Sequence, residues 1–166
     1  MKNVSSFVLL AALLALGAWF CVYILFPNPE KIIRQRLTQL AGKASFSAGE
    51  GNLGKLAAAE DIAGYFATNV EVDINVPGRV QHTLMGRAEI QQAALGARER
   101  LNGLTVQFPD INITVGPGKQ SAVADLTVEV RVAGESDTVV QEMKFTFQKT
   151  EDGWLITRVE TVRTLS

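Results

Sequence analysis

Residues 122–162 constrain the fold of this chain more than any other stretch. Every even position from 122 to 132 is apolar, and the odd positions include Asp125, Thr127, Glu129 and Arg131. This period of two is typical of a strand with one buried and one solvent-facing side. Over residues 141–148 the phase reverses, with Met143, Phe145 and Phe147 as the apolar positions. The pattern predicts two long neighbouring strands of one sheet.

The turns and the charges predict how these strands pair. Residues 134–137 are the expected hairpin turn, and residues 150–153 end in the Asp-Gly signal of a tight reversal before a last strand at Trp154. Pairing Arg131 with Glu142 sets Glu129 opposite Lys144. Opposite charges across a strand pair contribute roughly 0.2–1 kcal/mol, so this register is the predicted one.

The elements upstream complete an α+β pattern. Asn28 is the expected N-cap of a helix that Pro29 opens and Gly42 ends. The remaining expected elements are a helix at 52–66, strands at 70–76 and 80–85 around a Pro77-Gly78 turn, a helix at 87–101, and a strand at 104–115 with a β-bulge at Pro109-Asp110. The order predicts a strongly bent antiparallel sheet wrapped over about three helices.

An apolar run precedes this domain. Phe7 to Phe26 is an unbroken run of 20 apolar or small residues, about the length needed to cross a bilayer core. We therefore expect residues 1–27 to be a transmembrane signal-anchor that contacts the lipid bilayer, and residues 28–166 to be a single domain. A cleaved signal peptide is the alternative, although its apolar region is usually shorter.

The flanking charges leave the orientation open. Lys2 precedes the apolar run, whereas Lys31, Arg34, Arg36 and Lys43 follow it. The positive-inside rule would keep the domain in the cytoplasm. A short charged N-terminus before a long apolar run is instead the usual bacterial signal-anchor form. We expect the bacterial inner membrane, with the domain exported to the periplasmic or extracellular side.

Composition argues against several classes of function. The chain has 16 basic and 17 acidic residues, without the clustered basic face of a nucleic-acid-binding protein. Its one histidine and one cysteine, Cys21 within the apolar run, form no familiar metal-ligand spacing. Gly116-Pro117-Gly118 lacks the Lys-Ser/Thr of a phosphate-binding loop. We therefore expect no nucleic-acid partner, metal or cofactor.

Three segments resemble a known superfamily. Residues 64–67 (Gly-Tyr-Phe-Ala) run directly into the strand that starts at Val70, residues 86–90 (Gly-Arg-Ala-Glu-Ile) open a helix after a strand, and residues 145–160 end the domain around Trp154. Together they are similar to the nuclear transport factor 2-like superfamily, the cystatin-like cone fold that includes SnoaL-like proteins and ketosteroid isomerase. The resemblance covers roughly residues 29–165.

The resemblance implies a cone with a pocket between the concave sheet face and the helices, and a homodimer through the convex sheet face. It also implies a catalytic carboxylate on the first strand of the isomerases, shortly after Phe66-Ala67. Ile74 falls at that position in this chain, and Asp73 lies one residue earlier. An offset of one residue in a strand points the side chain to the opposite face.

Several residues are candidates for a site. His82 shares the phase of Leu84 and would be a general base if it points into the cone; the alternative is an exposed edge histidine. Asp110 at the bulge and Asp73 are the candidate catalytic carboxylates. The alternative for Asp110 is that it stabilises the turn, and the alternative for Asp73 is that it is solvated. The expected pocket-lining residues are Tyr65, Phe66, Leu84, Trp154 and Ile156. A second bulge is expected to turn Val159 inward and Arg158 and Glu160 outward.

The preferred hypothesis is a membrane-anchored, non-catalytic domain that binds a small apolar ligand or a protein partner in or around the cone. One alternative is a SnoaL-like isomerase, cyclase or hydrolase that uses general acid–base chemistry. Another is a purely structural dimeric scaffold with a cone filled by its own side chains. The sequence does not choose among them.

Overall fold

The computed structural model describes residues 28–75 and 82–162. In chain order the elements are α2 (Pro29–Ala44), β1 (Phe46–Ser47), α3 (Asn52–Ala63), β2 (Phe66–Ile74), β3 (His82–Met85), α4 (Arg87–Arg100), β4 (Gly103–Gln107), β5 (Ile111–Val115), β6 (Ser121–Val132), β7 (Thr138–Thr150) and β8 (Gly153–Thr161). The predicted anchor and the Pro77-Gly78 turn lie outside these residues. Within 28–75 and 82–162, no helix has the length and apolar character needed to span a membrane.

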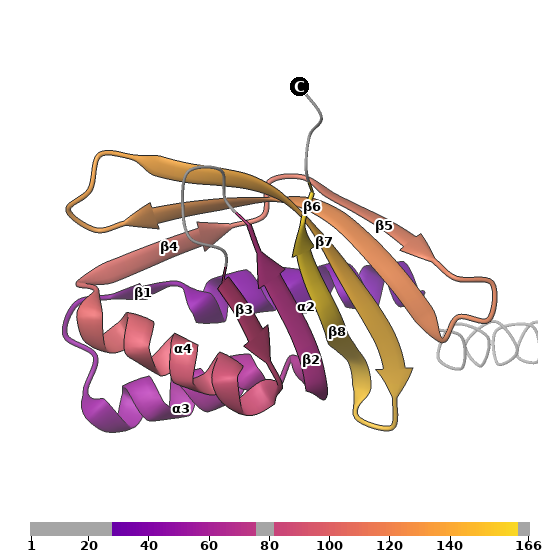
Figure 1. The fold of residues 1–166 in the computed structure, drawn as a ribbon, viewed down its shortest axis with the longest axis horizontal. Coiled ribbons are helices and arrows are strands. Elements are labelled where there is room, and N and C mark those ends of the chain that lie inside the picture. Colours follow the sequence, from indigo (N-terminus) through magenta and orange to yellow (C-terminus); the bar gives the residue numbers. More distant parts are fainter. Residues whose placement is uncertain (1–27, 76–81, 163–166) are drawn as a thin grey trace, which may run out of the picture.

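The sheet curls over the helices, as the sequence predicts for a cone. Its strand order is β1-β4-β6-β7-β8-β2-β3, and β5 also pairs with β6. Figure 1 shows the long strands β6, β7 and β8 curving across the molecule, with α3 and α4 together below the other end of the sheet, while α2 lies nearest to β4 and β5. The predicted sheet was wholly antiparallel, but β2 and β8 are parallel. The chain between these two strands includes β3, α4 and β4 to β7, so no short turn forces them to be antiparallel.

The predicted start of α2 is confirmed and its predicted end is wrong. The Asn28 side chain accepts a hydrogen bond from the Glu30 N–H at 3.0 Å, and Pro29 opens the helix. The helix continues past Gly42 to Ala44, where the Ser45 hydroxyl donates to the Ala41 carbonyl at 2.8 Å. A glycine in an exposed helix position costs only about 1 kcal/mol, which the cap and the buried face of the helix offset.

The predicted pairing of the long hairpin is also wrong. Leu126 lies opposite Met143 and Asp125 opposite Lys144, so the strands are shifted by four residues from the charge-based register. In the observed register the pair next to the turn is Arg131 and Thr138. Compared with the predicted register, β7 is therefore paired with β6 closer to the turn. Two exposed charge pairs are worth less than several additional backbone hydrogen bonds and their packing.

The inner face of the sheet and the helices share one core. Its large members include Ile33, Leu37, Phe147 and Ile156, all almost fully buried. The opposite, outer face of the sheet carries the alternate polar residues. Seen from the side of Figure 1, the surface is largely hydrophilic, with a brown patch over the lower left end of α3. Two exposed leucines of α3, Leu53 and Leu56, account for apolar surface on this helix.

Arg98 is the one charged residue of the described ranges that is buried, at 4% exposure. From α4 its guanidinium donates to the Glu50 carboxylate at 2.5 Å and to the Lys43 carbonyl at the end of α2. It also lies over the Phe46 ring, 4.7 Å from its centre. One side chain thus joins α4, the end of α2, β1 and the loop before α3.

Candidate functional site

The break between β4 and β5 creates the main irregularity in the sheet. Gln107 lies opposite Glu129, and Ile111 lies opposite Leu126. The three residues between Gln107 and Ile111 therefore face only two residues of β6. The Thr127 N–H bridges the break by donating to the Asp110 carbonyl at 3.1 Å. This confirms the predicted bulge at Pro109-Asp110. The extra residue is what returns Ile111 to the inner phase.

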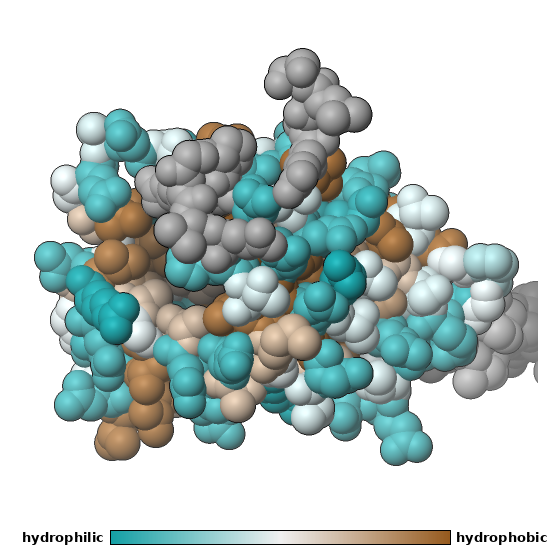
Figure 2. Space-filling view, in the orientation of Figure 1, coloured by the Kyte–Doolittle hydropathy of each residue, from teal (hydrophilic) through white to brown (hydrophobic). Residues whose placement is uncertain are grey.

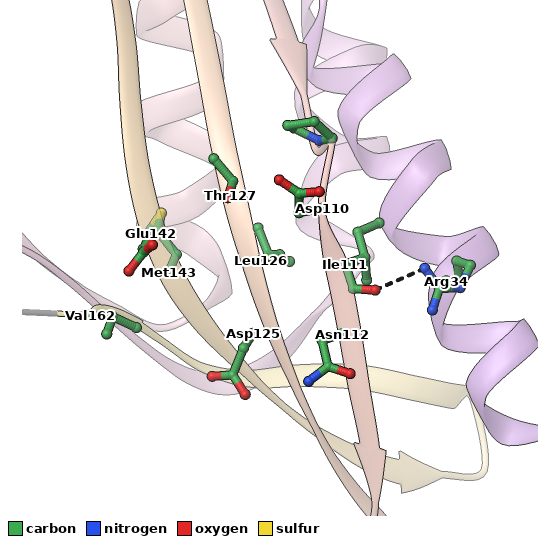
Figure 3. A pocket seen from close by; sticks show the side chains of 11 residues that line it. Arg34, Asp110, Ile111, Asn112, Asp125, Leu126, Thr127, Glu142, Met143 and Val162 are labelled. Atoms are coloured by element: carbon green, nitrogen blue, oxygen red, sulfur yellow. Dashed lines mark hydrogen bonds between the residues drawn. The ribbon is translucent and has the colours of Figure 1, made fainter. Parts of the chain in front are cut away.

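A hollow of about 700 Å³ lies at this break. Figure 3 shows its side chains on α2, on β5 with the loop before it, on β6 and β7, and at Val162 after β8. The lining residues are Arg34, Pro109, Asp110, Ile111, Asn112, Asp125, Leu126, Thr127, Glu142, Met143 and Val162. The hollow is therefore built from segments far apart in the sequence, and only the bulge marks it locally.

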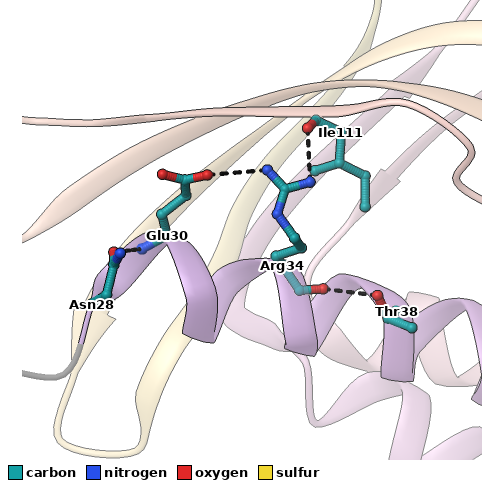
Figure 4. A network of polar contacts seen from close by, with 5 residues as sticks. All are labelled: Asn28, Glu30, Arg34, Thr38 and Ile111. Atoms are coloured by element: carbon teal, nitrogen blue, oxygen red, sulfur yellow. Dashed lines mark hydrogen bonds and ion pairs between the residues drawn. The ribbon is translucent and has the colours of Figure 1, made fainter.

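Arg34 forms one wall of the hollow from α2. Its guanidinium donates to the Ile111 carbonyl at 3.0 Å and to the Glu30 carboxylate at 3.1 Å (Figure 4). The Asn28 side chain caps the backbone N–H of Glu30 at the start of α2, and the carboxylate of Glu30 holds Arg34 one turn later in the helix. Because Ile111 belongs to a strand with only one partner among the described strands, this contact also covers part of an open sheet edge.

The rest of the lining is rich in carboxylates. Asp110, Asp125 and Glu142 come from the bulge, β6 and β7, and Arg34 is the single cation among the lining residues. Three carboxylates and one guanidinium give the lining a formal charge of −2. Lys144 lies next to this surface, opposite Asp125. Within the described ranges, no group of three or more potential ligands is arranged to hold a metal ion.

The three candidate catalytic residues lie apart. His82 opposes Ile74 and so shares the inner face at the rim of the sheet, where it is exposed. Asp73 opposes Thr83 and lies on the outer face. Asp110 is on the far side of the sheet, five strand spacings from β3 along the sheet, or about 24 Å at roughly 4.8 Å per spacing. The structure assembles no acid–base pair from these residues.

The exposure of His82 gives a direct test of this placement. Diethyl pyrocarbonate, which acylates accessible imidazoles, is expected to modify the single histidine at the rate of an exposed histidine in a short peptide. The modified chain should keep its free energy of unfolding, measured by urea titration, because no core contact depends on the ring. Slow modification that speeds up only on unfolding would contradict this and place the imidazole inside the cone.

The expected pocket-lining residues are mostly core residues. Phe66, Trp154 and Ile156 are buried in the main cluster. Tyr65 is half-buried, and the Arg36 guanidinium lies 4.9 Å from the centre of its ring. Leu84 lines a separate groove beside α4. Phe66, Trp154 and Ile156 thus belong to the packed core of the described residues and line neither the hollow nor the groove.

The second predicted bulge is confirmed in β8. The pairing with β7 shifts between Ile156 and Arg158, which buries Val159 and turns Arg158 outward. Arg158 pairs with Glu160 at 3.1 Å and with Glu71 at 3.0 Å. The hydrogen bond to Glu160 and the nearby charge of Glu71 raise the pKa of the Arg158 guanidinium. This part of the outer face is thus occupied by ion pairs within the chain.

Sequence reasoning found Asp110 but missed the rest of the hollow. The alternation correctly places Asp125, Thr127 and Glu142 on the solvent phase of their strands, but nothing local shows that they meet. The spacing of Glu30 and Arg34 is the i, i+4 spacing of a helical ion pair. That spacing was a usable signal for the orientation of Arg34.

Comparison with known proteins supports the fold. No protein-family model and no curated protein sequence matches this chain. Among solved structures, an NTF2-like protein with a cystatin-like fold from Novosphingobium aromaticivorans is similar, with 22% identity, a TM-score of 0.56, and 77% of this chain and 79% of that chain covered. The yeast UBP3-associated protein BRE5 has 14% identity and a TM-score of 0.60, with 84% and 100% covered.

Aln2 from a Streptomyces species is a third similar structure, with 14% identity, a TM-score of 0.59, and 83% of this chain and 94% of that chain covered. Identities this low establish the architecture alone. The chain has the nuclear transport factor 2-like, cystatin-like cone fold, as its sequence motifs indicate.

Proposed function

We propose that this protein is a membrane-anchored, non-catalytic binding domain, and that the hollow at the β4–β5 break is its binding site for a basic segment of a protein partner. The observation that carries the proposal is the hollow itself, which gathers Asp110, Asp125 and Glu142 around one cavity. Binding energy at such a site comes from charge-assisted hydrogen bonds, which are the stronger kind.

The packed interior supports binding on the outside of the cone. A ligand between the sheet and the helices would need space that Phe147, Trp154 and Ile156 occupy in the described structure. The hollow needs no such rearrangement, since it is already open to solvent. A preformed site loses less free energy to ordering on binding. This favours a protein partner over a small apolar ligand.

The position of the hollow suits a site at the bilayer surface. Arg34 is six residues beyond Asn28, or about 9 Å along a helix that rises roughly 1.5 Å per residue. Asn28 follows the end of the proposed anchor, Phe26, by two residues. In this proposal the anchor holds the hollow near the membrane on the exported side, where it meets the partner.

The charge of the lining defines the chemistry of the partner. A lining charge of −2 favours lysine or arginine side chains, and the exposed edges of Leu126 and Met143, which are otherwise buried, supply a small apolar part of the lining. A segment with two basic residues around an apolar one has this chemistry. The yeast structural neighbour is, by its name, associated with another protein, which is the kind of role proposed for this domain.

The test is a calorimetric titration of the full chain in lipid nanodiscs with acetyl-Lys-Leu-Lys-amide. Acetyl-Glu-Leu-Glu-amide is the reversed-charge control. We expect the basic peptide to bind, and its dissociation constant to rise about tenfold or more in the Asp110→Asn/Asp125→Asn double variant. The reason is that one hydrogen bond to a charged group contributes about 1.5–3 kcal/mol.

Asp152→Asn is the matched control, because Asp152 is an exposed carboxylate in the β7–β8 turn and does not line the hollow. Its affinity should equal that of the unaltered chain. Equal binding of both peptides, or unchanged binding by the double variant, would contradict the proposal.

A further inference from the structure

The exposed side of α4 forms a groove separate from the hollow. It has a volume of about 620 Å³ and is lined by Leu84, Glu89, Gln92, Ala93, Gly96, Ala97, Arg100 and Leu101. Figure 1 shows α4 on the outside of the helical layer, and Figure 2 shows tan and white surface over it between hydrophilic edges. The groove is therefore a helix face without a partner among the described elements.

Four residues form one straight line along this face. Glu89, Ala93, Gly96 and Arg100 have spacings of four, three and four residues, which is the seam of a helix that packs against another helix. A Cβ atom at Gly96 would meet no atom within 4 Å. With such small central residues a second helix can approach to about 8 Å between axes.

The charges at the two ends of the seam favour an antiparallel copy of the same helix as the partner. If a second α4 lies antiparallel with its centre between Ala93 and Gly96, Ala93 opposes the partner subunit's Gly96. Glu89 then opposes the partner subunit's Arg100, and two-fold symmetry forms the same ion pair at the other end. A parallel copy would place Glu89 against the partner subunit's Glu89. We propose that two copies of this chain associate through antiparallel α4 helices.

The local structure prepares this contact. One carboxylate oxygen of Glu89 accepts the Met85 N–H at 2.7 Å, which fixes the side chain near the start of the seam. Holding a side chain in place before binding reduces the entropy lost on association. On the outer sheet face, Arg158 is already paired with Glu71 and Glu160. The α4 seam is thus better suited to self-association than that part of the convex sheet face.

The size of the groove implies a weak dimer. A contact made by one helix from each copy is smaller than the roughly 1,200–2,000 Å² of a stable protein–protein interface. Chains held together on a bilayer have a high effective concentration, which compensates for weak affinity. This part of the argument rests on the proposed anchor, which would bring two copies together on the bilayer.

The test is disulfide cross-linking of the full chain in membranes, in a Cys21→Ser background. Two differently tagged chains, one with Ala93→Cys and one with Gly96→Cys, are co-expressed and oxidised. We expect a disulfide between the two tags. The control replaces Ala93→Cys by Leu53→Cys, which lies on another helix and is 86% exposed, and should give about tenfold less product if the antiparallel contact is specific.

Charge reversal tests the register with the same readout. Adding Glu89→Arg to both chains sets arginines opposite each other and should reduce the cross-link about tenfold. Adding Glu89→Arg to one chain and Arg100→Glu to the other restores both ion pairs and should restore the product. All four residues of the seam lie outside the core, and thermal unfolding by circular dichroism checks that each variant is folded.

Cross-linking no greater than that of the Leu53→Cys control would overturn the proposal, as would the same yield from all charge combinations. The seam shares no residue with the hollow, so this result and the peptide titration succeed or fail separately.

Discussion

Replacing Arg98 by alanine is expected to lower the free energy of unfolding by about 2–4 kcal/mol, because the carbonyl at the end of α2 loses its donor and the partly exposed carboxylate of Glu50 loses its cation. The Arg98 side chain is 3% exposed, and the substitution leaves the carboxylate of Glu50 and the carbonyl of Lys43 without their donor. It also removes the cation above the Phe46 ring. The measurement is urea-induced unfolding of the full chain in detergent, followed by circular dichroism.

A matched exposed pair gives the control. Arg131 lies 3.7 Å from Glu129 with 60% of its side chain exposed, and Arg131→Ala should cost less than about 1 kcal/mol. Arg98→Lys should remain strongly destabilised, because an ammonium group does not reproduce the planar set of donors. A cost below about 1 kcal/mol for Arg98→Ala would show that this side chain does not hold the helices together.

Phe147→Ala is expected to destabilise the domain by about 3–5 kcal/mol, because it opens a cavity in a packed core. Phe147 is 1% exposed and lies opposite Ala122 on β6 and Ile156 on β8. The measurement is the same urea titration. Leu53→Ala, at a position 86% exposed, should change the free energy of unfolding by no more than about 0.5 kcal/mol.

The Phe147 variant also tests whether the cone interior is filled. An apolar cavity made by truncation can bind a small apolar molecule such as benzene. Benzene should therefore raise the midpoint of unfolding of Phe147→Ala and leave that of the unaltered chain unchanged. Equal stabilisation of both chains would reveal an apolar cavity already present in the unaltered protein.

Local patterns predicted the fold class and both bulges. The apolar phase changes across Pro109-Asp110, and an unbroken last strand would point the charged Arg158 and Glu160 inward. Each pattern therefore requires an extra residue in the strand, and the structure has one at each place. Such signals are local, because side chains alternate between the two faces of a strand and an extra residue reverses this alternation. The resemblance in residues 64–67 and 145–160 likewise indicated the cone architecture.

Long-range features were beyond this reasoning. The register of β6 and β7 was predicted from two charge pairs, whereas the observed pairing of Leu126 with Met143 reflects the full length of both strands. Arg98 stands in the charged sequence Arg98-Glu99-Arg100, which is typical of a solvated helix face. Its burial depends on Glu50 and Phe46, which are about fifty residues away in the sequence.

The hollow was predictable only in part for the same reason. Asp110 was found through its bulge, while Arg34 and Glu142 reach the same cavity from segments more than a hundred residues apart. No pattern within one strand or helix shows that such side chains converge. The arrangement follows from the order of β5, β6 and β7 in the curled sheet.

The location of a bound basic peptide tests the central claim most directly. The chain has three methionines, of which Met143 lines the hollow and Met85 lies at the end of β3. In the full chain with ¹³C-labelled methionine methyl groups, acetyl-Lys-Leu-Lys-amide should shift the Met143 signal and leave Met85 unchanged. Trp154 opposes Lys149, six residues from Met143 along β7, or about 20 Å at roughly 3.4 Å per residue.

In a Trp19→Phe background, the emission of Trp154 therefore reports on the other end of the cone. We expect a shift of Met143 that saturates with the peptide while the Trp154 emission stays constant. A change in Trp154 emission with no shift of Met143 would place the ligand inside the cone and contradict the assignment of the hollow as the binding site.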